Sequence, residues 1–225
     1  MQPVQIAVAA VHLLLTAHLP QSQAQSFANT GNTSTPWFCH ELECASYTVV
    51  GRNADYETRQ YSSANWVSAN VQNYTYRAAL SEGFAPLFKY ISGANKDAVN
   101  INMTAPVLVK VASGAGPFCQ SNFTVSFYVP TAQGNTPVPT DASVYLNRLP
   151  SATYFVSSFG GYADDNTVPA QAAALTAKLT ANGEAFDNSV FWTAGYDAPY
   201  KLSDRHNEIW ILKSGEPAAA KSVAG

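Results

Sequence analysis

An internal repeat constrains the fold of this 225-residue chain more than any other feature of its sequence. Three pairs of similar segments lie 89 residues apart: Tyr-x-x-Arg at 56–59 and 145–148, an aromatic-Val-Ser run at 66–68 and 155–157, and Thr-Ala at 104–105 and 193–194. A fixed offset of this kind indicates two copies of one structural unit.

Each copy has the pattern of two strands, a helix and two strands. Alternation of apolar and polar residues, which is typical of half-buried strands, occurs in the segments 56–71, 99–111, 123–130, 145–159, 190–196 and 208–212. A duplicated strand-strand-helix-strand-strand unit predicts an α+β fold, in which a twisted, eight-stranded, antiparallel, barrel-like sheet is flanked by two helices.

The helix of the first copy is predicted over 74–91, with Gly93 ending it and Pro86 bending it. One face of this helix carries apolar residues at helical spacing, namely Leu80, Phe84, Leu87, Phe88 and Ile91. The second helix is expected to begin near Thr167 as the cap and to stop at Gly183.

The N-terminal region predicts export. The first forty residues contain no Asp, Glu, Lys or Arg, and an apolar run at 4–19 resembles the core of a secretory signal. We expect a signal peptide over 1–24, with an uncleaved anchor as the alternative. The remaining parts are an N-terminal arm over 25–46 with Cys39 and Cys44, one domain over 47–213 and a flexible tail over 214–225.

Sequons and cysteines agree with a secreted protein. Glycosylation sequons lie at Asn32, Asn73, Asn102 and Asn122, with Asn102 in a strand-like segment. An oxidising compartment lets one pair of the three cysteines, Cys39, Cys44 and Cys119, form a disulfide, and the sequence leaves all three pairings open. A metal site at Cys39, His40 and Cys44 is the weaker interpretation, because no second ligand pair follows at zinc spacing.

Charge and composition exclude several classes of function. Charged residues make up only 12% of the chain and the formal net charge is −3, so nothing attracts it to nucleic acid or to an anionic membrane. Of four histidines, only His40 and His206 lie outside the signal segment, and neither adjoins a recognisable nucleophile. We therefore expect a protein that is not an enzyme. A small hydrolase or isomerase is the least favoured alternative.

The apolar face of the first helix offers a binding site. A flat apolar ligand with acidic edges, such as haem, suits such a face, since Lys201 and Arg205 supply positive charge for carboxylates. The plainer interpretation is that these apolar side chains bury the helix against the sheet.

Several motifs, in the right order from about 47 to 213, resemble the SOUL haem-binding family. They include Tyr-Glu-Thr-Arg-Gln-Tyr at 56–61, Met-Thr-Ala-Pro-Val at 103–107, Thr-Ala-Gly-Tyr-Asp-x-Pro at 193–199 and Arg-x-Asn-Glu-x-Trp at 205–210. The resemblance implies a duplicated barrel with two helices and a non-covalently bound tetrapyrrole in an apolar surface groove beside the first helix. It also implies no established catalytic activity.

Transferred residue by residue, the resemblance implies a secreted, monomeric haem or porphyrin carrier with contacts at Phe84, Leu87, Phe88, Tyr196 and Lys201, the last pairing with a propionate. The alternative is a protein or peptide interaction module in which haem binding is incidental.

Gln60 stands where some members of the family carry a histidine that has been taken as an iron ligand, and glutamine is a poor ligand for haem iron. Haem then binds without a protein axial ligand, or His40, His206 or Tyr196 replaces the histidine, or haem binding is weak or lost.

Overall fold

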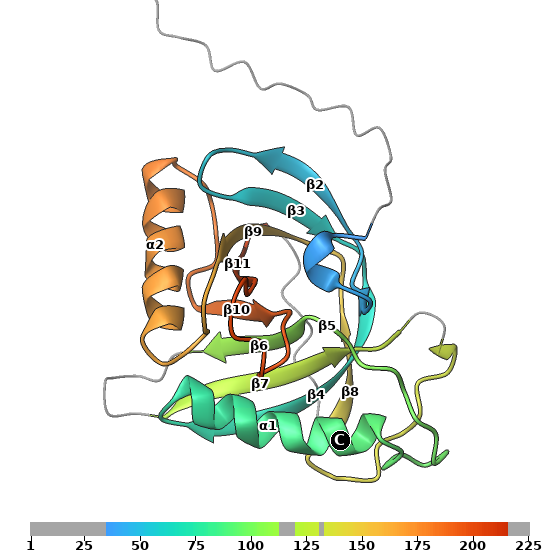
Figure 1. The fold of residues 1–225 in the computed structure, drawn as a ribbon. Coiled ribbons are helices and arrows are strands. Elements are labelled where there is room, and N and C mark those ends of the chain that lie inside the picture. Colours follow the sequence, from blue (N-terminus) through green and yellow to red (C-terminus); the bar gives the residue numbers. More distant parts are fainter. Residues whose placement is uncertain (1–34, 113–119, 131–132, 216–225) are drawn as a thin grey trace, which may run out of the picture. The chain divides into compact units, whose positions relative to one another are not determined.

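The structure, a computed structural model, describes residues 35–112, 120–130 and 133–215. All described elements belong to one compact unit, Gly31–Gly225. They form two helices and a curled, nine-stranded antiparallel sheet shaped as a half-barrel (Figure 1), which confirms the α+β prediction. The predicted signal peptide and most of the predicted tail lie outside the described residues.

The sheet order shows the duplication directly. Its strands, in the order in which they lie, are β2 (Tyr47–Arg52), β3 (Glu57–Tyr61), β9 (Ala152–Phe159), β11 (Asn207–Leu212), β10 (Val190–Gly195), β6 (Val107–Ala112), β7 (Ser121–Tyr128), β4 (Ala64–Asn73) and β8 (Val144–Leu149). From β3 to β8 the two copies mirror each other, because the first strand of each copy pairs with the second strand of the other. The copies also pair at the centre of the sheet, where β6 lies beside β10.

The prediction of eight strands is one short. Strand β2 pairs antiparallel with β3 at the edge of the sheet, with an irregularity between Val49 and Gly51. It precedes the repeated unit, so the repeat gave no sign of it. In addition, the predicted strand over 99–111 is two separate strands, β5 (Thr104–Ala105) and β6, on either side of Pro106, which has no N–H to donate to a sheet. Strand β5 pairs in parallel with β1 (Glu43–Cys44) in the N-terminal arm.

Both predicted helices are present, with corrected starts. Helix α1 (Tyr76–Ile91) begins two residues later than expected, because Thr75 is its N-cap and accepts a hydrogen bond from the Ala78 amide. We predicted that Thr167 caps helix α2 (Thr167–Ala181), but Thr167 is the first residue of the helix. Instead, the Asp164 carboxylate accepts hydrogen bonds from the amide and the hydroxyl of Thr167.

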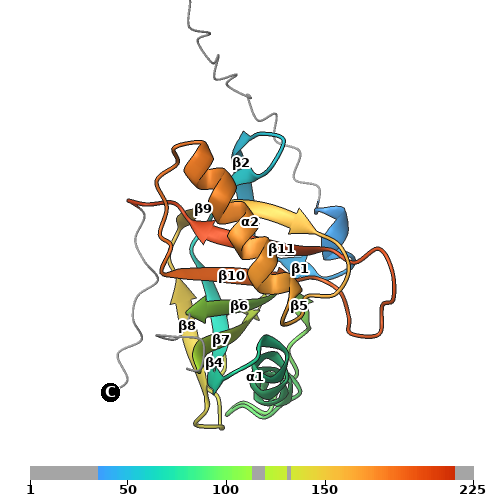
Figure 2. The ribbon, with the colours of Figure 1, turned by 90° about the vertical axis from the view of Figure 1, so that its left-hand side faces the viewer.

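The two helices lie against the outer face of the sheet (Figures 1 and 2), α1 over β4 and β7 and α2 over β11. Successive residues of a strand point to opposite faces, so each strand serves two cores. In β9, Phe155 contacts the α2 side, whereas Tyr154 and Val156 belong to an aromatic cluster on the inner face. The N-terminal arm adds Phe38, together with Cys39, to this inner cluster.

Candidate functional site

Two phenylalanines on α1 form an exposed aromatic surface, which we call the aromatic patch. Phe88 is 50% exposed, and its ring stacks on that of the half-buried Phe84 with centroids 5.8 Å apart and planes 14° from parallel. Phe84 in turn meets the edge of Phe127 in the core at 5.0 Å. Leu87 lies between them in sequence but is fully buried, so it supports the helix from below. The apolar face therefore both packs against the sheet and presents aromatic rings to solvent.

The other two predicted contacts, Tyr196 and Lys201, lie in the loop from 196 to 206 that joins β10 to β11. Tyr196 is buried in the inner cluster, whereas Leu87 belongs to the outer one, with Phe84 packed against it. Lys201 Nζ donates to Asp197 Oδ1 at 2.6 Å and to the Asp204 carbonyl at 2.8 Å. Burial would raise the pKa of Asp197, but the hydrogen bond from Lys201 and others lower it, so the ion pair persists at neutral pH. The structure thus divides the five predicted residues into two groups.

The three candidate axial ligands, His40, His206 and Tyr196, each contact a carboxylate. His40 Nε2 lies 2.9 Å from Asp197 Oδ1, and His206 Nε2 lies 2.9 Å from Glu208 Oε1. Tyr196 donates its hydroxyl to Glu208 Oε2 at 2.8 Å. Gln60 is exposed on β3, a strand that pairs only with β2 and β9 in the described sheet.

A buried carboxylate, which sequence reasoning did not single out, organises the inner face. Glu208 is completely buried and accepts four hydrogen bonds: from Arg59 Nη1 at 2.9 Å and His206 Nε2 at 2.9 Å to Oε1, and from Tyr196 Oη at 2.8 Å and Trp210 Nε1 at 2.8 Å to Oε2. Arg59 is also buried, donates to Glu57 Oε2 at 2.7 Å and lies 4.3 Å over the Tyr47 ring. Arg59 and Glu208 each lie in a motif noted in the sequence, at 56–61 and at 205–210, but neither motif indicated that the two side chains meet.

The Arg59–Glu208 pair is ionised. Burial alone would raise the pKa of Glu208, but the hydrogen bond from His206 and the charge of Arg59 outweigh it and hold that pKa below its ordinary value. Burial would likewise lower the pKa of Arg59, but the facing Glu208 raises it further above its already high value. Burial raises the pKa of Tyr196, which stays a neutral donor. A carboxylate can only accept, so His206 Nε2 carries the proton of this contact.

The N-terminal arm covers this network. A short 3-10 helix, η1 (Trp37–Cys39), places the Phe38 ring flat on the His206 imidazole, 4.1 Å away and 4° from parallel. The arm is closed by a disulfide between Cys39 and Cys44, which decides among the three possible pairings, and Cys119 lies outside the described residues. With both sulfurs in this bond, a thiolate metal site at the arm is ruled out.

Loss of this disulfide is expected to cost about 2 kcal/mol of unfolding free energy, because the closed loop is short. The measurement is urea denaturation of a Cys39→Ser/Cys44→Ser double variant, with Cys119→Ser as the matched control. An unfolding midpoint that matches the wild type would show that the arm is held by its packing alone.

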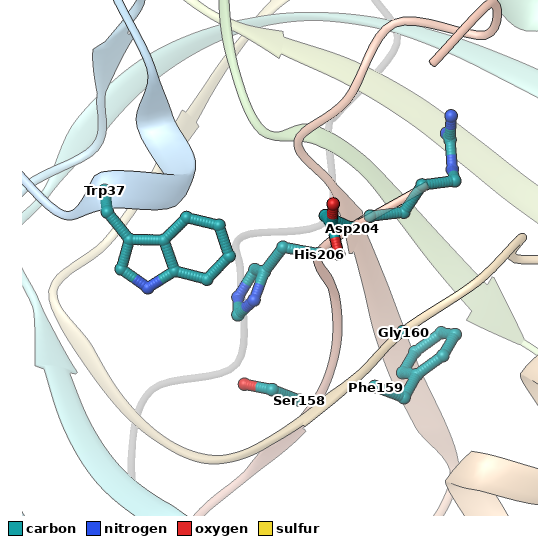
Figure 3. A pocket seen from close by; sticks show the side chains of 7 residues that line it. Trp37, Ser158, Phe159, Gly160, Asp204 and His206 are labelled. Carbon is teal, nitrogen blue, oxygen red and sulfur yellow. The ribbon is translucent and has the colours of Figure 1, made fainter. Parts of the chain in front are cut away.

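Beside the arm lies an open pocket of about 310 Å³. It is lined by Trp37, Ser158, Phe159, Gly160, Asp204, Arg205 and His206. In Figure 3 an edge of the Trp37 indole points toward the His206 imidazole. The Ser158 hydroxyl points toward the same side of the pocket as these two rings. Of these residues, the sequence had pointed only to His206 and Arg205.

In the described part of the chain, no helix is both long and apolar enough to cross a membrane. The same residues contain no group of three or more His, Cys, Asp or Glu side chains placed to hold a metal ion.

Comparison with known proteins agrees with the fold. The C-terminal domain of EcmrR superimposes with a TM-score of 0.56, covering 70% of this chain and 96% of that domain at 11% sequence identity. The chain therefore shares the overall fold of that domain.

Sequence comparison is more specific. The SOUL heme-binding protein family matches residues 42–212. Heme-binding protein 2 of Homo sapiens is 39% identical over 163 residues, covering 72% of this chain and 80% of the relative. Heme-binding protein 1 of Mus musculus is 30% identical over 163 residues, covering 72% and 86%. The chain belongs to the SOUL heme-binding protein family.

Proposed function

We propose that this protein binds haem or a related porphyrin non-covalently on the aromatic patch of α1, and that it does so as a secreted monomer without a catalytic role. The observation that carries the proposal is Phe88, a large apolar ring that is 50% exposed on a helix whose other apolar residues are mostly covered. Membership of a haem-binding family supports the choice of ligand.

The geometry of the patch suits a flat ligand. Phe84 and Phe88 are nearly parallel at 14°, so a porphyrin can cover the exposed ring and remove apolar area from water. Leu87 is fixed in the core and holds α1 in place beneath the two rings. Offset stacking of this kind adds to the energy of simple burial.

Lys201 is the proposed partner of a propionate. An ammonium group has three N–H donors, and the described contacts of Lys201 Nζ use two of them, on Asp197 and on the Asp204 carbonyl. Its side chain is 30% exposed, which leaves the third donor accessible to a carboxylate. Tyr196 acts from beneath by anchoring the loop to Glu208.

We further propose that the iron has no axial ligand from the protein. His40, His206 and Tyr196 are each bound to a carboxylate, and Gln60 lies on β3 at the far end of the sheet order from β4, which α1 covers. Breaking one of these contacts would leave Asp197 or Glu208 with an unmet hydrogen bond, which is costly for buried groups.

The proposed secretion is supported by the N-terminal sequence and by the sequons. Asn102 and Asn122 are exposed, and Asn102 lies before β5 rather than within a strand. Asn73 is partly buried and its Nδ2 donates to Glu82 Oε2 at 3.3 Å. We therefore expect higher glycan occupancy at Asn102 and Asn122 than at Asn73. Peptide mapping after glycosidase treatment measures the occupancy.

Phe88→Asp is expected to weaken haemin binding by about tenfold or more, because it replaces a stacking ring with a charge that repels propionates. The measurement is a haemin titration followed by the Soret band. Val50→Asp is the matched control, since Val50 is 54% exposed on β2, and it should bind as the wild type does. Lys201→Gln should weaken binding less than Phe88→Asp. Equal affinity of Phe88→Asp and wild type would place haem elsewhere.

A further inference from the structure

We propose that the open pocket beside the N-terminal arm binds the sugar ring of a neutral carbohydrate. This site is separate from the aromatic patch of α1, because its lining residues come from η1, the end of β9 and the β10–β11 loop. Its volume of about 310 Å³ is at the small end of the range for ligand pockets and suits a sugar ring rather than a whole porphyrin.

The first argument is the aromatic wall. Trp37 is 67% exposed, whereas the other three tryptophans are at most 4% exposed. The indole is nevertheless fixed, because its ring meets Phe38 at 5.8 Å and His206 at 5.4 Å, both edge to face. The Cys39–Cys44 disulfide further restrains η1. A fixed, exposed indole is an apolar platform on which the C–H face of a sugar ring can lie.

The second argument is that three polar side chains of the pocket can accept hydrogen bonds. Asp204 offers a carboxylate whose described contact is one long bond of 3.4 Å from Ser203 to Oδ2, which leaves Oδ1 available. His206 donates from Nε2 to Glu208, so in the neutral ring Nδ1 is an acceptor, and it has no partner among the described residues. The exposed Ser158 hydroxyl adds one group that can both donate and accept.

These features select the class of ligand. Sugar hydroxyls supply the donors that Asp204 and His206 require, and the sugar ring supplies the apolar face that Trp37 requires. A porphyrin would bring its propionates to the Asp204 carboxylate, which disfavours it here. Arg205 also lines the pocket: its guanidinium donates to the carbonyls of Ala198 and Lys201 and lies over the Tyr162 ring at 4.5 Å, and its buried Nε has no partner among the described residues, so it can donate to a sugar oxygen.

One wall of the pocket, Trp37, lies outside the family match, whereas its other lining residues lie within it. The family match begins at residue 42, so Trp37, Phe38 and His40 precede it. The arm that contributes the indole is docked by Phe38 on His206 and by His40 on Asp197. The pocket shares no lining residue with the aromatic patch of α1, so carbohydrate binding is tested separately from haem binding.

The experiment is calorimetric titration of the full chain with neutral hexasaccharides of glucose, mannose, xylose and N-acetylglucosamine. We expect saturable binding of at least one of them at about millimolar concentration. Trp37→Ala should weaken it about tenfold, the loss expected for one aromatic contact. Tyr74→Ala, which removes an aromatic ring that is 69% exposed before α1, is the matched control and should leave binding unchanged.

A second set of variants protects the test against misfolding. Ser158→Ala removes only a surface hydroxyl and should weaken sugar binding, while Phe88→Asp should leave it intact. Wild-type haemin binding by Trp37→Ala would show that the fold persists. Sugar binding by none of the hexasaccharides, equal binding by Trp37→Ala and wild type, or displacement of the sugar by haemin would each overturn the proposal. If benzylamine binds and none of the sugars does, the proposal is also overturned, because Asp204 then serves a cation.

Discussion

Replacing Glu208 with leucine is expected to lower the free energy of unfolding by about 3 kcal/mol, since it removes the fully buried partner of Arg59 and leaves only the partly exposed Glu57 to balance that charge. Arg59 is only 3% exposed, so water does not replace the lost carboxylate. The variant also strips a hydrogen-bond acceptor from His206, Tyr196 and Trp210. Urea denaturation near neutral pH measures the loss.

The matched control is the double variant Arg59→Met/Glu208→Leu. Replacing both members of a buried ion pair with apolar residues is far less costly than removing one, so the double variant should recover part of the loss. If the double variant is no more stable than Glu208→Leu, the unpaired charge of Arg59 is not the cause of the lost stability.

The same carboxylate predicts a dependence on pH. The pKa of Glu208 is lower in the folded chain than its ordinary value, so its contribution to stability is fully present above the unfolded pKa and is lost as the pH falls through the folded pKa. Wild type should therefore lose stability in acid more steeply than Arg59→Met/Glu208→Leu. Parallel stability curves for the two proteins between about pH 5 and pH 2 would exclude this linkage.

Gly83→Ala is expected to destabilise the fold by about 1–3 kcal/mol, although alanine normally stabilises a helix interior relative to glycine. A Cβ at position 83 would lie 2.5 Å from Val125 Cγ2 and 2.8 Å from Val125 Cβ. Val125 is fully buried on β7, so α1 would have to move away from the sheet. Thermal and urea unfolding of the variant measure the cost.

Two further variants isolate the close approach of α1 to β7. Ser81→Ala lies on the exposed side of the same helix and should be neutral or slightly stabilising. Val125→Ala removes the Cγ2 methyl that the new Cβ would meet most closely, so the two substitutions together should cost less than the sum of their separate effects. Additive costs would mean that the glycine is needed for another reason.

The sequence predicted most of the fold because duplication leaves a regular signal. The 89-residue offset identified two copies, and apolar spacing located both helices. Strand β2 escaped because it lies before the repeat, and the cap of α2 was misassigned because Asp164, rather than Thr167, supplies the accepting oxygen. Local patterns gave the elements but not every boundary.

The candidate site was less predictable, because its contacts join distant parts of the chain. Helical spacing placed Leu87 and Phe88 on one face, but only the packing shows that the first is buried and the second half exposed. The Arg59–Glu208 bond spans 149 residues, and no local pattern reports such a pair. Lys201 was predicted as a ready partner for propionates, yet Asp197, four residues away, already holds it.

The most direct test of haem binding on the aromatic patch uses the iron itself as the probe. Paramagnetic Fe(III) broadens the NMR signals of nearby nuclei, and diamagnetic zinc protoporphyrin serves as the matched control. Broadening by haemin that is strongest over residues 84–91 is the predicted result. Broadening centred on 37–40 and 204–206, or none at saturating haemin, would contradict the proposal.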